Sequence, residues 1–454
     1  MKILFISLGC DKNLVDSEVM LGLIRERGYQ ITNDENDADI IIVNTCCFIN
    51  DAKEESINTI LEMAEYKTTG KLKALIVTGC LGQRYKDEIQ NEIKEVDAVL
   101  GTSSYDAIVQ VIDSVLGGER TVQMKELDYL PSVETNRINT TGGYFSYLKI
   151  AEGCDKHCTY CIIPSLRGNY RSIPMERLLK EATVLAESGI KELILVAQET
   201  TLYGKDIYGE KSLPKLLKEL CRIDGLEWIR ILYCYPEEIT DELIEVMKSE
   251  EKICNYLDMP IQHASNSVLK RMGRKTSKEE LIEIVRKLRK EIPNIALRTT
   301  LITGFPGETE EDHEELKGFI KELQFDRLGV FTYSKEEDTP AAKMKNQIRK
   351  HIKKKRQAEL MEIQQQIAFD KAHTRIGEKL RVMIEGKLPD EDSEDSVEAN
   401  RTDVGKVYIG RTYMDAPNVD GYIFVQTHAE VMSGEFVEVV VTDAKEYDLI
   451  GELI

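Results

Sequence analysis

The sequence predicts an α/β protein in three parts: an N-terminal parallel-sheet α/β domain, a central TIM-like full or partial α/β barrel, and a small C-terminal antiparallel β-barrel. Three observations predict this arrangement. Short apolar runs alternate with amphipathic stretches over the first 125 residues, and a longer strand–helix alternation resumes near Tyr147. The last 80 or so residues are short β-type runs separated by Gly, Pro and Asp. Such alternation of strands and helices is typical of a parallel sheet covered on both faces.

The N-terminal part contains three apolar runs that we expect to be buried strands, at residues 3–6, 40–43 and 72–77. Helices are expected between them, at residues 17–27 and 52–66. Residues 117–145 are polar and irregular, which is typical of a domain boundary. We therefore expect domains at 1–125, 140–372 and 374–454.

The central part has six candidate strands, and amphipathic helices are expected between several of them, for example at 175–188 and 278–290. The strands are expected at 147–150, 192–197, 228–232, 256–259, 296–302 and 327–333. An α/β barrel of this kind has its active site at the carboxyl ends of the strands. A basic stretch at 343–356 continues to about His373 and is expected to be a linking helix with a solvated charged face, although it could also contact a substrate.

The C-terminal part has four short β-type runs, at 380–385, 406–410, 421–426 and 436–442. This spacing favours a small antiparallel barrel. An acidic loop at 390–395 interrupts it.

Composition narrows the class of protein. A chain of 454 residues with 42% hydrophobic residues is long enough for two or three domains. We see no signal peptide and no membrane-spanning run, so we expect a soluble cytoplasmic protein with no membrane partner. Its ten cysteines are then expected to be reduced thiols. The net charge of −20 argues against a protein whose whole surface grips a phosphate backbone.

The sharpest motif is a CxxxCxxC spacing formed by Cys154, Cys158 and Cys161. Three thiolates so close together can hold three irons of a cubane cluster and leave the fourth iron open for a ligand. A zinc site is the alternative, but zinc motifs usually pair two CxxC units, and no second pair follows. The motif therefore favours an iron–sulfur cluster directly after the first strand of the barrel.

A second set of cysteines is spread along the N-terminal domain. Cys10, Cys46 and Cys80 each follow an apolar strand, so a parallel sheet would bring them to one carboxyl edge. They form either a second three-thiolate site or three buried core cysteines. Cys47 adjoins Cys46, and since neighbours on an extended chain point to opposite sides, we choose Cys46 as the ligand. The other three cysteines are expected in the core: Cys221, Cys234 and Cys254.

Polar residues also end a strand of the predicted barrel. Gln198 and Glu199 lie where barrel residues face the active site. His263 lies in a similar place, and we assign it no role.

With these motifs in view, nearly the whole chain resembles the radical S-adenosylmethionine methylthiotransferases. The CxxxCxxC segment with Tyr160 is similar to the superfamily signature, and Cys10, Cys46 and Cys80 match the cysteines of the family's N-terminal domain. The last part resembles a TRAM barrel.

The resemblance implies two 4Fe–4S clusters and S-adenosylmethionine as cofactors. The cluster at Cys154, Cys158 and Cys161 would bind S-adenosylmethionine and cleave it reductively to a 5′-deoxyadenosyl radical. The cluster at the three N-terminal cysteines would carry the methylated sulfur that is transferred. Residues expected to bind the cofactor are Tyr160, Gln198 and Glu199. An electron donor such as a flavodoxin or ferredoxin is implied as a partner.

The family has two branches with different substrates. MiaB-like members modify an isopentenylated adenosine of tRNA, and RimO members modify the β-carbon of an aspartate in protein twelve of the small ribosomal subunit. Residues 8–18, 161–168 and 410–421 are similar to the RimO branch. Asp11 departs from the proline common in that branch, and Cys47 replaces a usual glycine, which leaves open a swapped ligand.

Charge gives a separate argument about the substrate. Residues 374–454 contain eight Lys or Arg and eighteen Asp or Glu, and so account for half of the net charge of −20. A barrel that grips tRNA should be basic, whereas an acidic one attracts a basic ribosomal protein. We therefore expect a ribosomal protein rather than tRNA as the substrate, although acidic surfaces are common and also serve solubility.

Two other readings stay open from the sequence. One is the tRNA methylthiotransferase, which shares the chemistry. The other is a non-catalytic RNA-binding protein that holds zinc or a cluster, which metal analysis would separate from an enzyme with about eight irons.

Overall fold

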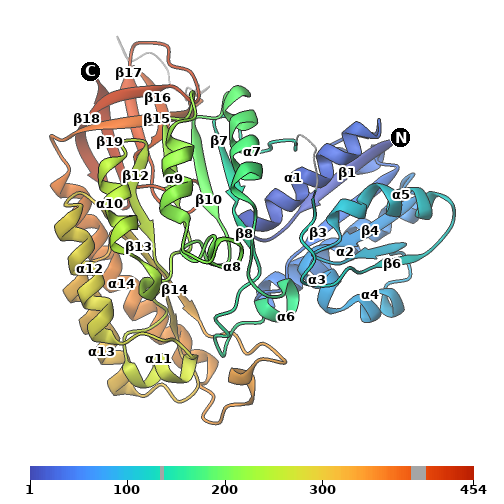
Figure 1. Ribbon diagram of the computed structural model, residues 1–454, viewed down its shortest axis with the longest axis horizontal. Coiled ribbons are helices and arrows are strands. Elements are labelled where there is room, and N and C mark those ends of the chain that lie inside the picture. The colour runs from blue at the N-terminus through green and yellow to red at the C-terminus, as the bar shows by residue number, and fades with distance from the viewer. Residues whose placement is uncertain (133–136, 390–404) are drawn as a thin grey trace, which may run out of the picture.

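The computed structural model describes residues 1–132, 137–389 and 405–454. Figure 1 shows three parts: an N-terminal α/β domain on one side, a central α/β part, and a C-terminal β-barrel above the central sheet. The acidic loop predicted at 390–395 lies outside the described residues.

The N-terminal domain is a six-stranded parallel sheet, as the sequence predicts. In sheet order the strands are β2 (Gln30–Ile31), β1 (Lys2–Ser7), β3 (Ile40–Thr45), β4 (Ala74–Thr78), β5 (Ala98–Leu100) and β6 (Thr121–Gln123). Helices cover both faces because alternate strand residues point to opposite sides. One face packs against α1 (Asp11–Glu26) and α5 (Ile108–Leu116), and the other against α2 (Asn50–Thr69), α3 (Gly79–Arg84) and α4 (Lys86–Glu92).

Helix α1 is longer than the sequence predicts. It begins at Asp11, directly after Cys10, rather than at residue 17. The added first turns are mostly polar, yet Lys12, Asn13 and Asp16 are buried, because this end of the helix faces the central part of the protein. Because polar residues interrupt the helical pattern of apolar residues there, the sequence predicts a later start for this helix.

The central part is an open six-stranded parallel sheet, which makes it a partial rather than a full barrel. In sheet order the strands are β14 (Arg327–Thr332), β13 (Ala296–Thr303), β12 (Ile253–Asp258), β11 (Trp228–Ile231), β10 (Glu192–Val196) and β7 (Phe145–Lys149). Its outer face is covered by helices α7 (Met175–Glu187), α9 (Leu213–Cys221), α10 (Asp241–Ser249), α12 (Lys278–Glu291), α13 (Glu310–Leu323) and α14 (Lys350–Thr374). Cys234 and Cys254 are buried in this part, as expected, and Cys221 is partly buried.

The C-terminal part is a closed five-stranded barrel, and its fold is the predicted one with two differences. The strands are β15 (Lys379–Lys387), β16 (Lys406–Arg411), β17 (Ile423–Thr427), β18 (Phe436–Lys445) and β19 (Asp448–Leu453). Strand β19 closes the barrel and has no counterpart among the predicted runs. It pairs parallel to β17, whereas the other four pairings are antiparallel.

The C-terminal barrel packs against the inner face of the central sheet. Its core residues share one apolar cluster with Trp228, Tyr256 and their neighbours on the sheet. Glu192 at the start of β10 is fully buried and accepts hydrogen bonds from Arg230 (2.7 Å) and Arg411 (2.6 Å). These contacts lie at the amino-terminal ends of the strands, so the opposite end of the sheet stays available for a site.

Among the residues that the structure describes, none of the helices is long and apolar enough to cross a membrane.

Candidate active site

The CxxxCxxC segment forms a loop that follows the first strand of the central sheet, at the end of the sheet where the parallel strands finish. It follows β8 (Ala151–Glu152) and leads into the short helix α6 (Ile163–Arg167). Gly153 opens the loop with φ +78°, and a Cβ there would lie 2.0 Å from the Asn169 carbonyl oxygen. Only glycine therefore fits this turn.

Cys154, Cys158 and Cys161 lie close together in this loop. Burial raises the pKa of Cys154 to about 11, and the neighbouring Cys158 thiol adds to the rise. Burial likewise raises the pKa of Cys161, with Cys158 and Cys154 as further causes. Three mutually repelling thiolates are stable together only when a cation neutralises them.

The donor set fits a cluster better than a single ion. In the described ranges, no three His, Cys, Asp or Glu side chains are grouped tightly enough to hold one metal ion. A cubane is larger than one ion, and three thiol sulfurs are its usual protein ligands when one iron stays open. The three cysteines therefore fit the cluster expected from the sequence.

Two aromatic rings lie against this loop. The Tyr235 hydroxyl lies 3.6 Å from the Cys158 sulfur, and the Arg274 guanidinium stacks on the Tyr235 ring at 4.1 Å. Tyr160 packs edge-on against Phe305, with ring centroids 6.5 Å apart. Tyr160 thus packs into the apolar cluster beside the loop, and its contact with a cofactor stays a prediction. Tyr235 and Arg274 were not selected from the sequence, because no local pattern marks them.

Glu199 is a buried carboxylate beside the loop. Its Oε1 accepts a hydrogen bond from Thr201 (2.6 Å), while its Oε2 has no hydrogen bond and only an ion pair with Lys156 at 3.4 Å. Burial raises its pKa to about 7, although Lys156 opposes the rise. A buried carboxylate oxygen without a donor is suited to receive a ligand ammonium group. The adjacent Gln198 instead donates to Glu152 Oε1 at 3.0 Å.

The three N-terminal cysteines meet at the carboxyl edge of their sheet, as the sequence predicts. Cys10 follows β1, Cys46 follows β3, and Cys80 lies in the first turn of α3 after β4. Burial raises the pKa of Cys46 to about 11, and Cys80 and Cys10 are close enough to add to it. Gly9 allows this approach, because a Cβ at its φ of +92° would lie 2.8 Å from the Cys46 Cβ.

Cys46 and Cys47 have different surroundings. Cys46 is half-buried and its sulfur faces Gly9, next to Cys10. Cys47 is fully buried in the apolar cluster that α2 covers, and the Cys80 thiol and the Arg84 guanidinium also lie beside it. The choice of Cys46 as the ligand therefore stays a prediction.

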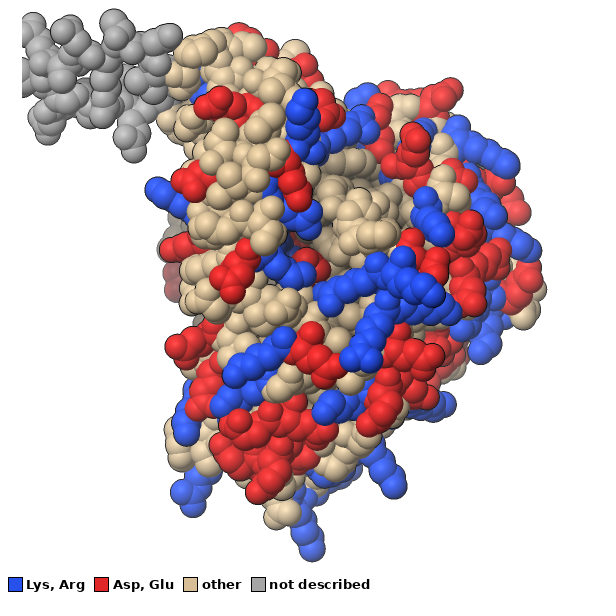
Figure 2. Space-filling view, turned by 90° about the vertical axis from the view of Figure 1, so that its left-hand side faces the viewer, with Lys and Arg blue, Asp and Glu red and all other residues tan. Residues whose placement is uncertain are grey.

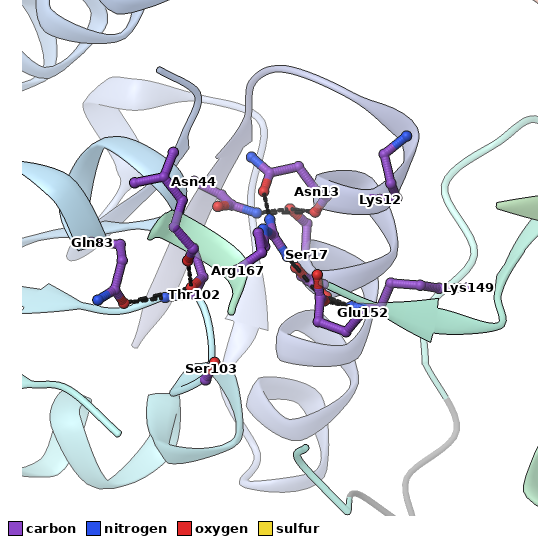
Figure 3. A network of polar contacts seen from close by, with 12 residues as sticks. Lys12, Asn13, Ser17, Asn44, Gln83, Thr102, Ser103, Lys149, Glu152 and Arg167 are labelled. Atoms are coloured by element: carbon purple, nitrogen blue, oxygen red, sulfur yellow. Dashed lines mark hydrogen bonds and ion pairs between the residues drawn. The ribbon is translucent and has the colours of Figure 1, made fainter. Parts of the chain in front are cut away.

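A buried network of charged and polar side chains links the N-terminal domain to the central part, and Figure 3 shows Arg167, Glu152 and Lys149 within it. Arg167 of α6 donates to Asn13 Oδ1 (2.6 Å), Asp16 Oδ2 (2.8 Å) and Glu152 Oε2 (3.1 Å). Lys149 of β7 donates to the same two carboxylates, those of Asp16 and Glu152. Burial alone would raise the pKa of Glu152, but Arg167 and Lys149 together lower it well below its usual value.

Arg167 also lies next to the N-terminal cysteines. Burial raises the pKa of the Cys80 thiol, and the neighbouring Arg167 guanidinium opposes this rise. Helix α6 is further fixed in the N-terminal domain, because Ile162 and Leu166 join its apolar core and Thr102 donates to the Leu166 carbonyl (2.7 Å). Since α6 directly follows Cys161, the network sets the position of one cysteine site relative to the other.

Tyr233 makes a second contact between the two parts. The Lys12 ammonium lies 3.3 Å from the centre of its ring, and its hydroxyl lies 3.2 Å from Asp11 Oδ1. Tyr233 holds a left-handed backbone conformation at φ +60°, in the segment that also contains Tyr235. Residues 233–235 therefore reach the Cys10 side and the Cys158 side at once.

Comparison with known proteins gives matches over most of the chain. Residues 2–101 match the family described as uncharacterized protein family UPF0004, residues 148–320 the radical SAM superfamily, and residues 376–454 the TRAM domain. A ribosomal protein uS12 methylthiotransferase RimO from Lachnoclostridium phytofermentans is 72% identical over 451 residues, which cover 99% of each chain. A protein of the same name from Clostridioides difficile is 48% identical and covers 100% of this chain and 99% of that one.

Solved structures support the fold alone. A radical S-adenosylmethionine methyltransferase, TsrM from Kitasatospora setae, solved with cobalamin and a [4Fe-4S] cluster, matches with a TM-score of 0.55 at 14% identity. The match covers 75% of this chain and 73% of that chain. From the full-length identity to its relatives, the chain belongs to the RimO family of methylthiotransferases within the radical S-adenosylmethionine superfamily.

Proposed function

We propose that this protein transfers a methylthio group to the β-carbon of an aspartate in ribosomal protein uS12. The observation that supports this most strongly is the 72% identity to a uS12 methylthiotransferase over 99% of both chains. The fold supports it, because Arg167, six residues after Cys161, lies beside Cys80 and binds Asp16 and Glu152.

Cofactor use follows from membership of the family, whose radical chemistry depends on S-adenosylmethionine and 4Fe–4S clusters. When bound, these groups supply a 5′-deoxyadenosyl radical and the sulfur that is transferred. We assign one cluster to Cys154, Cys158 and Cys161, and the other to the N-terminal set of Cys10, Cys46 and Cys80. The surrounding protein then positions and shields these groups.

The side chains near the CxxxCxxC loop have distinct proposed roles. Glu199 Oε2 would accept the ammonium group of S-adenosylmethionine, and Tyr160 would line the pocket. Gln198 is held by Glu152 and keeps one unpartnered buried oxygen, Oε1, which is free to receive a donor from the cofactor.

The domain division at 1–125, 140–372 and 374–454 is part of this proposal. The three family matches each fall inside one of these ranges. The ribosomal substrate also leads us to propose that the protein acts in the cytoplasm, where ribosomes are found.

A tRNA substrate is not favoured, because the full-length relatives described above carry the uS12 name. Basic and acidic side chains are interspersed on the face in Figure 2, with a group of acidic ones near its lower edge. Of the eighteen acidic residues in 374–454, seven lie in 390–404, outside the described residues. Attraction of a basic protein by the C-terminal barrel therefore stays a prediction from the sequence.

The test offers both substrates in parallel. Reconstituted protein is incubated anaerobically with S-adenosylmethionine, reductant and either uS12 or tRNA with isopentenylated adenosine. We expect uS12 to gain one methylthio group on an aspartate and the tRNA to remain unchanged. Modified tRNA with unmodified uS12 would overturn the proposal.

A further inference from the structure

Six basic side chains gather on one exposed stretch at the start of α14 and just before it: Lys343, Lys345, Arg349, Lys350, Lys354 and Lys355. Residues 339–358 contain no Asp or Glu, although the chain as a whole has a net charge of −20. Within the described part of the chain, only Lys355 of the six has an acidic partner, Glu359 at 3.6 Å. This basic segment is therefore a local positive patch on an acidic protein.

The basic segment is fixed against the CxxxCxxC loop. The Ala341 amide donates to the carbonyl oxygen of Thr159, which lies between Cys158 and Tyr160, at 2.9 Å. Ala341 is buried in the apolar cluster that Tyr160 and Met344 also contact. Gln347 then ties the segment to itself, donating to the carbonyls of Ala341 (3.0 Å) and Met344 (3.1 Å).

Of the three acidic residues just before the segment, Glu336 and Glu337 are engaged by the N-terminal domain, whereas Asp338 is exposed. Glu336 is buried and binds Lys53 (2.8 Å) and Arg84 (3.3 Å) of the N-terminal domain. Glu337 accepts a hydrogen bond from Tyr85. In Figure 1 the orange loop between β14 and α14, which contains these residues, extends from the end of the central sheet toward the N-terminal domain. The two carboxylates thus anchor the segment and leave its positive charge facing outward.

Reductive cleavage of S-adenosylmethionine requires one electron from outside the protein in each cleavage. That electron must leave a reduced carrier and enter the cluster site, so the carrier is oxidised by one electron as the cluster is reduced by one. A carrier should dock where the cluster loop is closest to the surface. The basic segment is packed on that loop, and its charge would attract an acidic protein.

We propose, on the basis of the function proposed above, that the basic segment at 343–355 is the docking surface for a small acidic one-electron carrier protein of the flavodoxin or ferredoxin type. Electron-transfer partners form small transient interfaces, which one segment of six charges can provide. RNA is a poorer fit, because an electron carrier must bind close to the cluster loop on which this segment packs, whereas RNA has no need of that position. The basic uS12 substrate would be repelled.

The test compares two full-length variants with equal charge removed. The patch variant is Lys343→Gln, Lys345→Gln, Arg349→Gln and Lys350→Gln together. The control replaces four exposed lysines on other elements: Lys94→Gln, Lys180→Gln, Lys218→Gln and Lys290→Gln. Binding of a bacterial flavodoxin, of a bacterial ferredoxin and of ribosomal RNA is measured separately by fluorescence anisotropy. Cluster reduction by each prereduced carrier is followed by stopped-flow absorbance.

At low salt, we expect the affinity of the patch variant for the carrier to fall at least about tenfold. The rate at which the carrier reduces its cluster should fall by a similar factor, while the control variant stays near wild type. Higher salt should weaken wild-type binding and erase the difference. The carrier type that shows this loss is the one the surface fits. Dithionite, a small reductant, should drive S-adenosylmethionine cleavage equally in all three proteins.

Equal loss in the patch and control variants would overturn the proposal, as would loss of ribosomal RNA binding with carrier binding intact. If the patch variant fails to fold, salt-independent carrier binding to the wild type would overturn it. Failure of wild-type protein to modify uS12 with dithionite would instead reject the proposed function, so the two failures are distinguishable.

Discussion

Arg167 and Asp16 belong to a buried set of two positive and two negative side chains, which allows a sharp prediction. Arg167 and Lys149 face Asp16 and Glu152, and all four are at most 5% exposed. Arg167→Met leaves two buried carboxylates with one lysine, and Asp16→Asn leaves one carboxylate with two cations. Breaking a buried pair in this way costs about 3–5 kcal/mol.

The double variant restores the balance of charge, so its cost should be smaller than the sum of the single costs. We expect a coupling energy of about 2 kcal/mol between Arg167 and Asp16. Hydrogen exchange of the α1 and α6 amides measures the cost of each variant, and the coupling energy is the difference between the double cost and the sum of the single costs. A cost of about 3–5 kcal/mol makes local opening roughly a hundred- to a few thousand-fold more frequent.

The matched control is Arg222→Met, which removes an exposed arginine paired with Glu219 and should cost less than about 1 kcal/mol. Single-variant costs that simply add in the double variant would refute the reasoning, since they would mean that the two charges do not interact.

Three further predictions address other parts of the structure. Replacing Cys10, Cys46 and Cys80 together with Ala should reduce the iron content from about eight to about four per chain and abolish methylthio transfer, while S-adenosylmethionine cleavage persists; unchanged iron would contradict the assignment. Burial lowers the pKa of His263 to about 3. Below pH 6.5 the unfolded state therefore binds a proton on this imidazole that the folded state does not bind, so the free energy of unfolding falls as the pH falls. Between pH 7 and pH 5 the urea stability followed by Trp228 fluorescence should drop by about 2 kcal/mol more in wild type than in His263→Gln, and equal drops would argue against a buried neutral imidazole. Glu192→Gln removes the carboxylate between Arg230 and Arg411 and should cost about 3–5 kcal/mol, seen as faster proteolytic release of the C-terminal barrel; an unchanged cleavage rate would show that this ion group does not hold the barrel.

The fold was largely predictable because parallel strands buried on both faces give continuous apolar runs. Residues 40–43 in β3 and 193–196 in β10 are examples. Strand β19 was missed because the run Asp448–Leu453 is short, contains Gly451 and alternates only weakly. It is a strand because it closes the barrel between β17 and β18, which is a tertiary effect.

The cysteine sites could be predicted because the CxxxCxxC spacing and the ends of apolar strands are local sequence signals. The network around Arg167 could not be predicted, since Arg167 lies 151 and 154 residues from Asp16 and Asn13 in the sequence. No local pattern specifies a partner at that distance. A signal was present nonetheless, because Lys149 is a charged residue at the end of a buried strand, and a buried charge requires a partner.

We expect this protein to need both cysteine sites for the methylthiolation of uS12. The most direct measurement is the mass of uS12 from a bacterial host that lacks its own uS12 methylthiotransferase and expresses either this protein or its Cys80→Ala variant. We expect one methylthio group on a single aspartate with the wild-type protein and none with the variant. Unmodified uS12 with wild-type protein, or equal modification with the variant, would contradict it.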